Sequence, residues 1–222
     1  MDGSSALIPK ANYFAVVVGP PGCGKSSLAA QLAHERLRAG RWVFVQDQNR
    51  EFRQVGAVEY TSVHEAELAI GQAFAQQRPV SRFVALCTAR GADDVLELAV
   101  RIGEQWNQRF QAVRAPLCLI VNETSSFEGS GSSYIDKTQE RAINLRRHLG
   151  LELVYCMQRP TQLPKSVWDV ITDAYLFAQV RPDRIVELEG NLNLPRGALA
   201  SLSTAAMPPH RYLHWQAGRG LL

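Results

Sequence analysis

The chain has 222 residues, of which 46% are hydrophobic and 20% are charged, and its formal net charge is +3. This composition excludes a disordered or fibrous protein and suits one α/β domain with a buried core. The small positive charge permits contact with nucleic acid but does not require it.

Short apolar runs alternate with amphipathic segments, which is typical of a mostly parallel sheet covered by helices on both faces. The strand-like runs are residues 13–18, 42–46, 82–87, 117–121, 151–157 and 174–180. Apolar residues at helical spacing follow the first run and end at Gly40, which predicts a helix there. A basic segment that ends at 146–150 is also predicted to be helical. We expect one domain over residues 1–222, with a core of about 13–180 and a C-terminal extension over 181–222.

Two further helices are predicted from capping patterns, in which a polar side chain precedes an acid by three residues. Ser62 with Glu65 opens one helix, and Asp94 with Glu97 opens the next. The segment 125–134 is rich in glycine and serine, so we expect a loop there.

The four cysteines have no C-x-x-C spacing, and three lie in apolar runs, so we expect buried thiols in a reducing compartment. No apolar run approaches the ~18 residues of a membrane span. Residues 1–10 also lack the apolar centre of a signal peptide. The sequence therefore predicts a soluble, cytoplasmic protein.

Residues 19–26, GPPGCGKS, match the phosphate-binding pattern G-x-x-x-x-G-K-[ST] between a predicted strand and a predicted helix. Glycines let backbone amides turn toward phosphate oxygens at the start of a helix. Lys25 is expected to reach the β- and γ-phosphates, and the Ser26 hydroxyl to bind Mg²⁺. Absence of an N-K-x-D guanine motif favours ATP over GTP. The predicted nucleotide-binding residues are Gly19, Pro20, Pro21, Gly22, Cys23, Gly24, Lys25, Ser26 and Ser27.

The run 117–121 ends at Asn122 and Glu123, where additional-strand P-loop ATPases have Asp-Glu. Glu123 is expected at the carboxyl edge of the sheet as the group that polarises the attacking water, although it can also be an ordinary strand-end acid. Asn122 can accept a hydrogen bond from a metal-bound water but adds no negative charge. We therefore expect weaker Mg²⁺ binding and slower turnover rather than none.

Three segments resemble the FtsK–HerA superfamily, especially the DNA-packaging ATPases of tailless membrane-containing viruses. DQNREF (47–52) resembles D-P-x-G-E-[FY] at Asp47, Glu51 and Phe52, without its Pro and Gly. The strand that carries Glu123 follows a long helix, as in that superfamily. RRHLGLELVYCMQRPTQLPKSVW (146–168) is similar to its Arg-His helix end, sensor strand and Gln-x-Pro sequel. The resemblance covers about 13–180 and implies a three-layer, RecA-like P-loop fold.

The resemblance also implies roles for residues near the γ-phosphate. Gln158 would contact the γ-phosphate or the attacking water, although a strand-end glutamine can instead bind a loop backbone. In a homo-oligomeric ring, expected to be a hexamer, Arg147 would reach a neighbour's γ-phosphate, with Arg146 and Arg141 as second choices. Arg159 is an alternative from the same subunit, and each of these arginines can also simply face solvent.

By this resemblance the protein is expected to be an ATP-hydrolysing translocase of double-stranded DNA, most consistent with a viral genome-packaging motor. Its expected partners are DNA, other copies of itself and a capsid or portal protein, in the host cytoplasm or with the virion. The loop 125–134 and HRYLHW (210–215) are candidate DNA contacts, or a passive loop and an edge strand.

Three alternatives remain open at this stage. One is a phage assembly ATPase similar to zonula occludens toxin, a class that normally carries a membrane span. Another is a nucleotide-gated binding protein with weak hydrolysis. A small-molecule P-loop kinase is less favoured, because Glu123 and Gln158 suit the activation of water.

Overall fold

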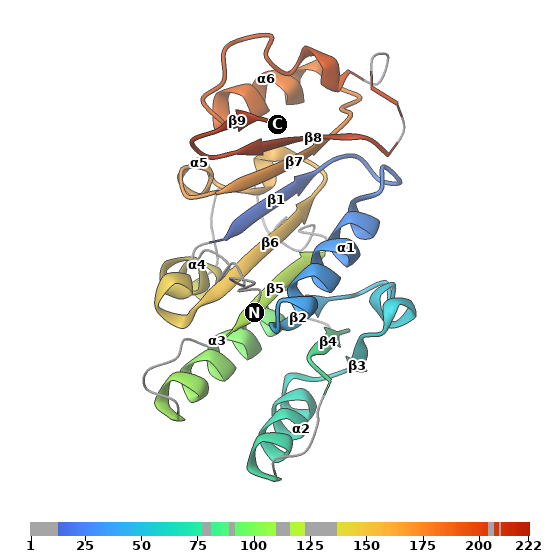
Figure 1. Ribbon diagram of the computed structural model, residues 1–222. Helices are drawn as coiled ribbons and strands as arrows, with labels where there is room; N and C mark the ends of the chain where they lie inside the picture. Colours follow the sequence, from blue (N-terminus) through green and yellow to red (C-terminus); the bar gives the residue numbers. More distant parts are fainter. Residues whose placement is uncertain are drawn as a thin grey trace, which may run out of the picture.

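The computed structural model describes residues 13–76, 81–88, 92–109, 116–122, 137–203, 207–208 and 210–222. These residues form one twisted sheet with helices on both faces (Figure 1). The strand order is β3-β4-β2-β5-β6-β1-β7-β8-β9. Pairing is parallel from β3 to β7 and antiparallel at β7–β8 and β8–β9. The mostly parallel α/β architecture predicted from the sequence is confirmed.

The six predicted strands form the centre of the sheet, and each of their residues is buried, because helices cover both faces. They are β1 (Phe14–Val18), β2 (Trp42–Gln46), β4 (Phe83–Leu86), β5 (Leu117–Asn122), β6 (Leu151–Met157) and β7 (Asp173–Phe177). The last of them ends earlier than predicted. Beyond Phe177 the chain leaves the sheet, since the Gln179 N–H donates to the Leu202 carbonyl at 2.6 Å.

The helices divide the core into two clusters, because alternate strand residues point to opposite faces. Helix α1 (Lys25–Arg38) covers one face, with Phe52 beside it. The other face packs against α2 (Val63–Gln76), α3 (Ala92–Arg109) and α4 (Lys137–Leu149). In the described part of the chain, no helix is long and apolar enough to cross a membrane.

The predicted helix starts are confirmed to within a few residues. The Glu65 N–H donates to Ser62 Oγ at 3.1 Å ahead of α2, as the capping pattern predicts. Helix α3 begins at Ala92, slightly before the predicted Asp94. The basic segment forms α4, which ends at Leu149 directly before β6.

Several short elements were not predicted, because their segments are too short for a periodic pattern to stand out. They are the strand β3 (Val58–Tyr60), the 3₁₀ segments η1 (Phe52–Val55), η3 (Pro160–Gln162) and η4 (Ala200–Leu202), and the helices α5 (Lys165–Trp168) and α6 (Pro182–Asn191).

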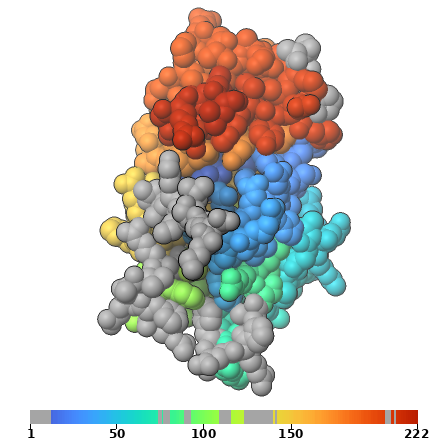
Figure 2. Space-filling model, viewed as in Figure 1, coloured from blue at the N-terminus to red at the C-terminus, as the bar shows by residue number. Residues whose placement is uncertain are grey.

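The C-terminal residues join the sheet. HRYLHW contributes to β8 (Tyr212–Gln216), which pairs with β7 and is followed by the short β9 (Gly220–Leu221). This segment therefore has the strand structure that was one of its two predicted alternatives. Figure 2 shows the C-terminal segment in orange and red at one end of the molecule, beside the blue surface of the segment that includes α1.

Candidate nucleotide-binding site

The carboxyl ends of the central parallel strands meet at one edge of the sheet, the position where open α/β folds bind ligands. Strand pairing places Val18 beside Met157 and Asn122 beside Cys156. Predicted site residues at or directly after these strand ends are Asp47, Asn122, Gln158 and Gly19. The fold therefore gathers along one edge residues that are more than 100 positions apart in the sequence.

The glycine-rich loop connects β1 to α1 at this edge. Gly22 and Gly24 have φ angles of +75° and +105°, in the left-handed region that favours glycine. The Gly19 N–H donates to the Met157 carbonyl at 3.1 Å, which fixes the loop to β6. Lys25 Nζ donates to the Pro20 carbonyl at 2.8 Å, so the ammonium group lies against the loop. A loop of this kind at a helix start can bind phosphate oxygens.

Two residues far along the chain lie against this loop, and the sequence did not predict either contact. A Cβ atom added to Gly19 would lie 2.7 Å from Phe177 Cβ and 2.5 Å from Cys23 Sγ, so only glycine fits. His210 Nδ1 lies 3.3 Å from the Cys23 carbonyl oxygen. Burial raises the pKa of the Cys23 thiol, while the Lys25 charge opposes that rise, so the thiol form is favoured.

The structure describes only part of the segment that was predicted to hold the metal ion and to activate the attacking water. Asn122 is the last residue of β5 and is 7% exposed. Glu123 and the loop 125–134 lie outside the described residues.

Gln158 directly follows β6, the strand between β1 and β5. Its backbone is held from two sides. Gln162 Oε1 accepts the N–H groups of Gln158 at 2.8 Å and of Arg159 at 2.9 Å. Arg184 Nη1 donates to the Gln158 carbonyl at 3.4 Å. Gln162 was not singled out from the sequence, and its position four residues after Gln158 is the signal that could have found it.

Arginines gather beside Gln158 around a hollow of about 220 Å³. Its lining residues are Arg159, Thr161, Arg181, Asp183, Arg184 and Glu187. Arg181 pairs with Asp183 through two contacts of 3.0 and 2.6 Å, so part of this positive charge is neutralised locally.

The candidate finger arginines lie at the other end of β6. Arg147 is exposed in the last turn of α4. The seven residues of β6 separate it from the carboxyl edge by roughly 20 Å. Arg146 is only 4% exposed, and its guanidinium carbon lies 5.6 Å from the Phe14 ring centroid. The side chain of Arg141 lies outside the described residues. Of Arg146 and Arg147, only Arg147 is exposed on the surface.

A groove of about 250 Å³ runs along the start of α1. Its lining residues are Ser26, Ser27 and Ala30 on one side and Glu51, Phe52 and Val55 on the other. The buried Asp47 holds the second side, since its carboxylate accepts the N–H groups of Glu51 at 2.9 Å and Phe52 at 2.8 Å. The sequence pattern identified Asp47, Glu51 and Phe52 but did not place Glu51 near Ser26.

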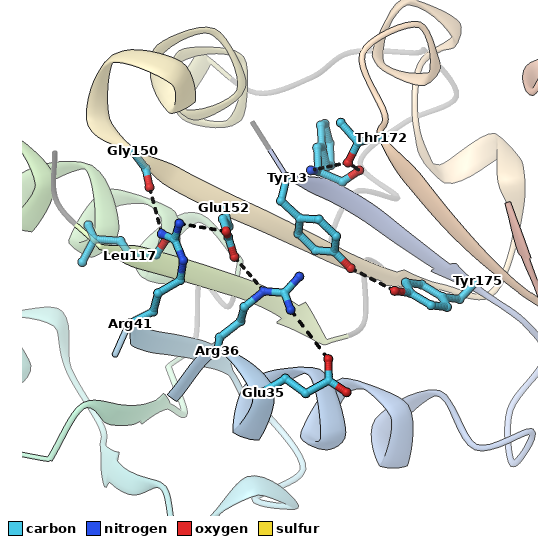
Figure 3. A network of polar contacts seen from close by, with 10 residues as sticks. Tyr13, Glu35, Arg36, Arg41, Leu117, Gly150, Glu152, Thr172 and Tyr175 are labelled. Atoms are coloured by element: carbon cyan, nitrogen blue, oxygen red, sulfur yellow. Dashed lines mark hydrogen bonds and ion pairs between the residues drawn. The ribbon is translucent and has the colours of Figure 1, made fainter. Parts of the chain in front are cut away.

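The amino edge of the sheet carries a different polar cluster, seen in Figure 3. Glu152 of β6 is buried between Arg36 Nε at 2.7 Å and Arg41 Nη2 at 2.9 Å. Arg41 Nη1 also lies 3.4 Å from the Gly150 carbonyl and 3.5 Å from the Leu117 carbonyl. Burial raises the pKa of the Glu152 carboxyl, and the two guanidinium groups oppose that rise.

The same cluster extends toward β7. The Arg36 guanidinium carbon lies 4.1 Å from the centroid of the Tyr13 ring, and the Tyr13 and Tyr175 hydroxyls are 3.2 Å apart. Thr172 Oγ1 accepts the Phe14 N–H at 3.0 Å and lies 3.2 Å from the Phe14 carbonyl oxygen, to which it can donate. This edge therefore joins α1 to β6, β1 and β7 through contacts within the protein.

Comparison with known proteins identifies the fold. No protein-family model matches the sequence, and no curated protein matches it. The genome-packaging NTPase B204 from Sulfolobus turreted icosahedral virus 2, in complex with ATP-gammaS, is 17% identical, with a TM-score of 0.69 over 93% of this chain and 92% of that chain. B204 from Sulfolobus turreted icosahedral virus, a DNA-packaging ATPase, is 14% identical, with a TM-score of 0.67 over 92% of both chains.

A bacterial structure is also similar. VirB4 of Thermoanaerobacter pseudethanolicus is 12% identical, with a TM-score of 0.58 over 94% of this chain and 87% of that chain. At these identities the likeness concerns the fold. The chain thus has the fold of the B204 genome-packaging ATPases, and the RecA-like P-loop architecture implied by its resemblance to the FtsK–HerA superfamily is confirmed.

Proposed function

We propose that this protein is an ATP-hydrolysing translocase of double-stranded DNA that acts as a viral genome-packaging motor. The observation that carries the proposal is the glycine-rich loop with Lys25 and Ser26, held beside Gln158 at the carboxyl edge of the sheet. This arrangement occurs in a fold that a genome-packaging NTPase solved with ATP-gammaS shares over 93% of this chain.

The phosphate end of the nucleotide would be bound by this chain's own groups. Loop amides and Lys25 would bind phosphate oxygens, and the Ser26 hydroxyl and the Asn122 side chain would hold Mg²⁺ directly or through water. Their oxygen donors suit a hard cation. The ion would neutralise negative charge on the phosphates. Glu123, by its place after β5, would orient and activate the attacking water, and the Gln158 amide would contact the γ-phosphate or that water.

A homo-oligomeric ring would complete the site. Arg147 stands at the amino edge, far from its own glycine-rich loop, so its proposed target is the nucleotide of a neighbouring subunit. A guanidinium group at this position can be worth ~10³–10⁵ in rate. A hexamer is our proposal for the ring, and the whole chain of residues 1–222 would act as one P-loop domain in each subunit.

The proposed cargo is the phosphate backbone of duplex DNA, with a capsid or portal protein as docking partner in the host cytoplasm or at the virion. Positive groups near Gln158, among them Arg159 and Arg184, support contact with phosphates. Such contacts do not depend on base sequence, which suits a motor that must move along any sequence.

The first test is Mg²⁺-dependent ATP turnover with and without double-stranded DNA. Lys25→Ala should abolish turnover, whereas the exposed Lys165→Ala, matched in chemistry but located on α5, should retain it. Turnover by the wild type that rises with DNA would support the motor. ATP turnover that is unchanged by DNA at low salt would contradict translocation.

Glu123→Gln tests the hydrolytic role separately. This variant should bind ATP and fail to hydrolyse it, because the amide cannot take a proton from water. Brisk hydrolysis by the variant would contradict the assignment of Glu123. Tight ATP binding by the wild type without turnover would favour the nucleotide-gated binding protein, since binding alone can switch affinity for a partner.

A further inference from the structure

We propose that Glu51 supplies the carboxylate that Asn122 lacks at the metal- and water-binding end of the site. This inference rests on the proposed ATPase function and adds a residue to it. Asn122 stands where an acid would hold a water of the metal, and its amide carries no charge. A site that binds Mg²⁺ together with phosphates commonly uses one or two carboxylates.

Asp47 cannot fill this role although it follows the neighbouring strand β2. It is 1% exposed, and each of its carboxylate oxygens accepts a backbone N–H, one from Glu51 and one from Phe52. The Asp47 carboxylate therefore serves to bind the backbone of Glu51 and Phe52. Those two hydrogen bonds fix the backbone position of Glu51.

Glu51 is exposed and lines the same 250 Å³ groove as Ser26. The groove is large enough for several water molecules, each of which occupies about 30 Å³ in the liquid. Burial raises the pKa of the Cys156 thiol, near the carboxyl end of β6, to about 12, Lys25 opposes that rise, and Glu51 adds only the last and smallest contribution to it.

Glu51 thus belongs to the groove that Ser26 lines, and Asp47, which holds Glu51, directly follows β2, the strand paired with β5 and its terminal Asn122. A carboxylate there can accept a hydrogen bond from a metal-bound water and add the negative charge that Asn122 does not provide. Glu51 thus acts on the metal through its water shell and is a positioning residue.

The test measures metal affinity rather than turnover. Mn²⁺ replaces Mg²⁺, and its binding to the full chain saturated with ATP-gammaS is followed by electron paramagnetic resonance. Glu51→Gln should weaken Mn²⁺ binding by about 10- to 100-fold, the usual effect of losing a group that orients a metal's ligands. Glu35→Gln is the matched control, because Glu35 is a partly exposed acid near the far end of α1, and it should change the affinity less than twofold.

A rescue variant distinguishes the loss of the Glu51 charge from a general disturbance of the structure. Asn122→Asp in the Glu51→Gln background should restore most of the Mn²⁺ affinity, because it returns a carboxylate to the same end of the site. Unchanged affinity in Glu51→Gln would overturn the proposal, and so would a loss that Asn122→Asp does not repair. No DNA is present in this test, so a protein that fails to respond to DNA would contradict the motor and leave the role of Glu51 standing.

Discussion

The two edges of the sheet use polar residues in opposite ways. At the amino edge, Glu152 is buried between Arg36 and Arg41, and its partners belong to the protein. At the carboxyl edge, Ser26 and Glu51 line a groove open to a ligand. Helix α1 joins the edges, since its 14 residues begin at the glycine-rich loop, span about 21 Å and carry Arg36 in their last turn. One end of α1 is thus fixed by contacts within the protein, and the other end carries the proposed phosphate site.

Disrupting the polar cluster at the amino edge should have the largest effect, and that effect should be a loss of stability. Glu152→Gln removes the carboxylate that the buried Arg41 and the mostly buried Arg36 share, and Arg36 keeps only its longer contact with Glu35 at 3.7 Å. Loss of one member of a buried ion pair costs about 3–5 kcal/mol, so the urea midpoint should fall sharply. Nucleotide affinity of the fraction that remains folded should change little, because Glu152 lies at the opposite end of β6.

The control for this change is an ion pair in solvent. Asp183→Asn removes the partner of Arg181, and both side chains are at least 60% exposed. Its unfolding midpoint should match that of the wild type, because exposed pairs contribute little. Equal loss of stability in both variants would show that burial at the amino edge does not set it apart.

A change at the carboxyl edge should instead affect ligand binding. Gly19→Ala places a methyl group 2.7 Å from Phe177 Cβ, so the loop must shift. Overpacking of this kind costs about 1–3 kcal/mol, and we expect about tenfold weaker ATP binding by isothermal titration calorimetry. Gly71→Ala on α2 is the control, because its added methyl group meets no atom within 4 Å. Normal ATP affinity in Gly19→Ala would mean that the loop tolerates the shift.

The smallest expected effect comes from a single hydroxyl group at the amino edge. Tyr13→Phe removes the 3.2 Å contact with the Tyr175 hydroxyl but keeps the ring against Arg36. The free energy of unfolding should fall by about 0.5–1.5 kcal/mol, the net value of one hydrogen bond. Tyr13→Phe combined with Tyr175→Phe should cost less than the sum of the two single changes, and strict additivity would contradict a direct coupling.

The glycine-rich loop and the central strands could be predicted from the sequence because their signals are local. GPPGCGKS encodes a turn and a helix start within eight positions, and uniformly apolar runs such as LCLIV require burial on both faces. Even the strand nature of HRYLHW was among the predicted alternatives. The helix α6 was missed, because its ten residues are too few for a periodic pattern to stand out.

The sequence by itself determined the α/β class, the phosphate-binding loop and the order of the polar residues that follow the central strands. Only the tertiary structure decided which of these residues meet. Strand order β2-β5-β6-β1 brings Asp47, Asn122 and Gln158 to one edge and leaves Arg147 at the other. It also decided that Asp47 is committed to the backbone while Glu51 faces the groove with Ser26. The physical reason is that such contacts join positions distant in the chain, and strand pairing across the sheet sets them rather than any local pattern.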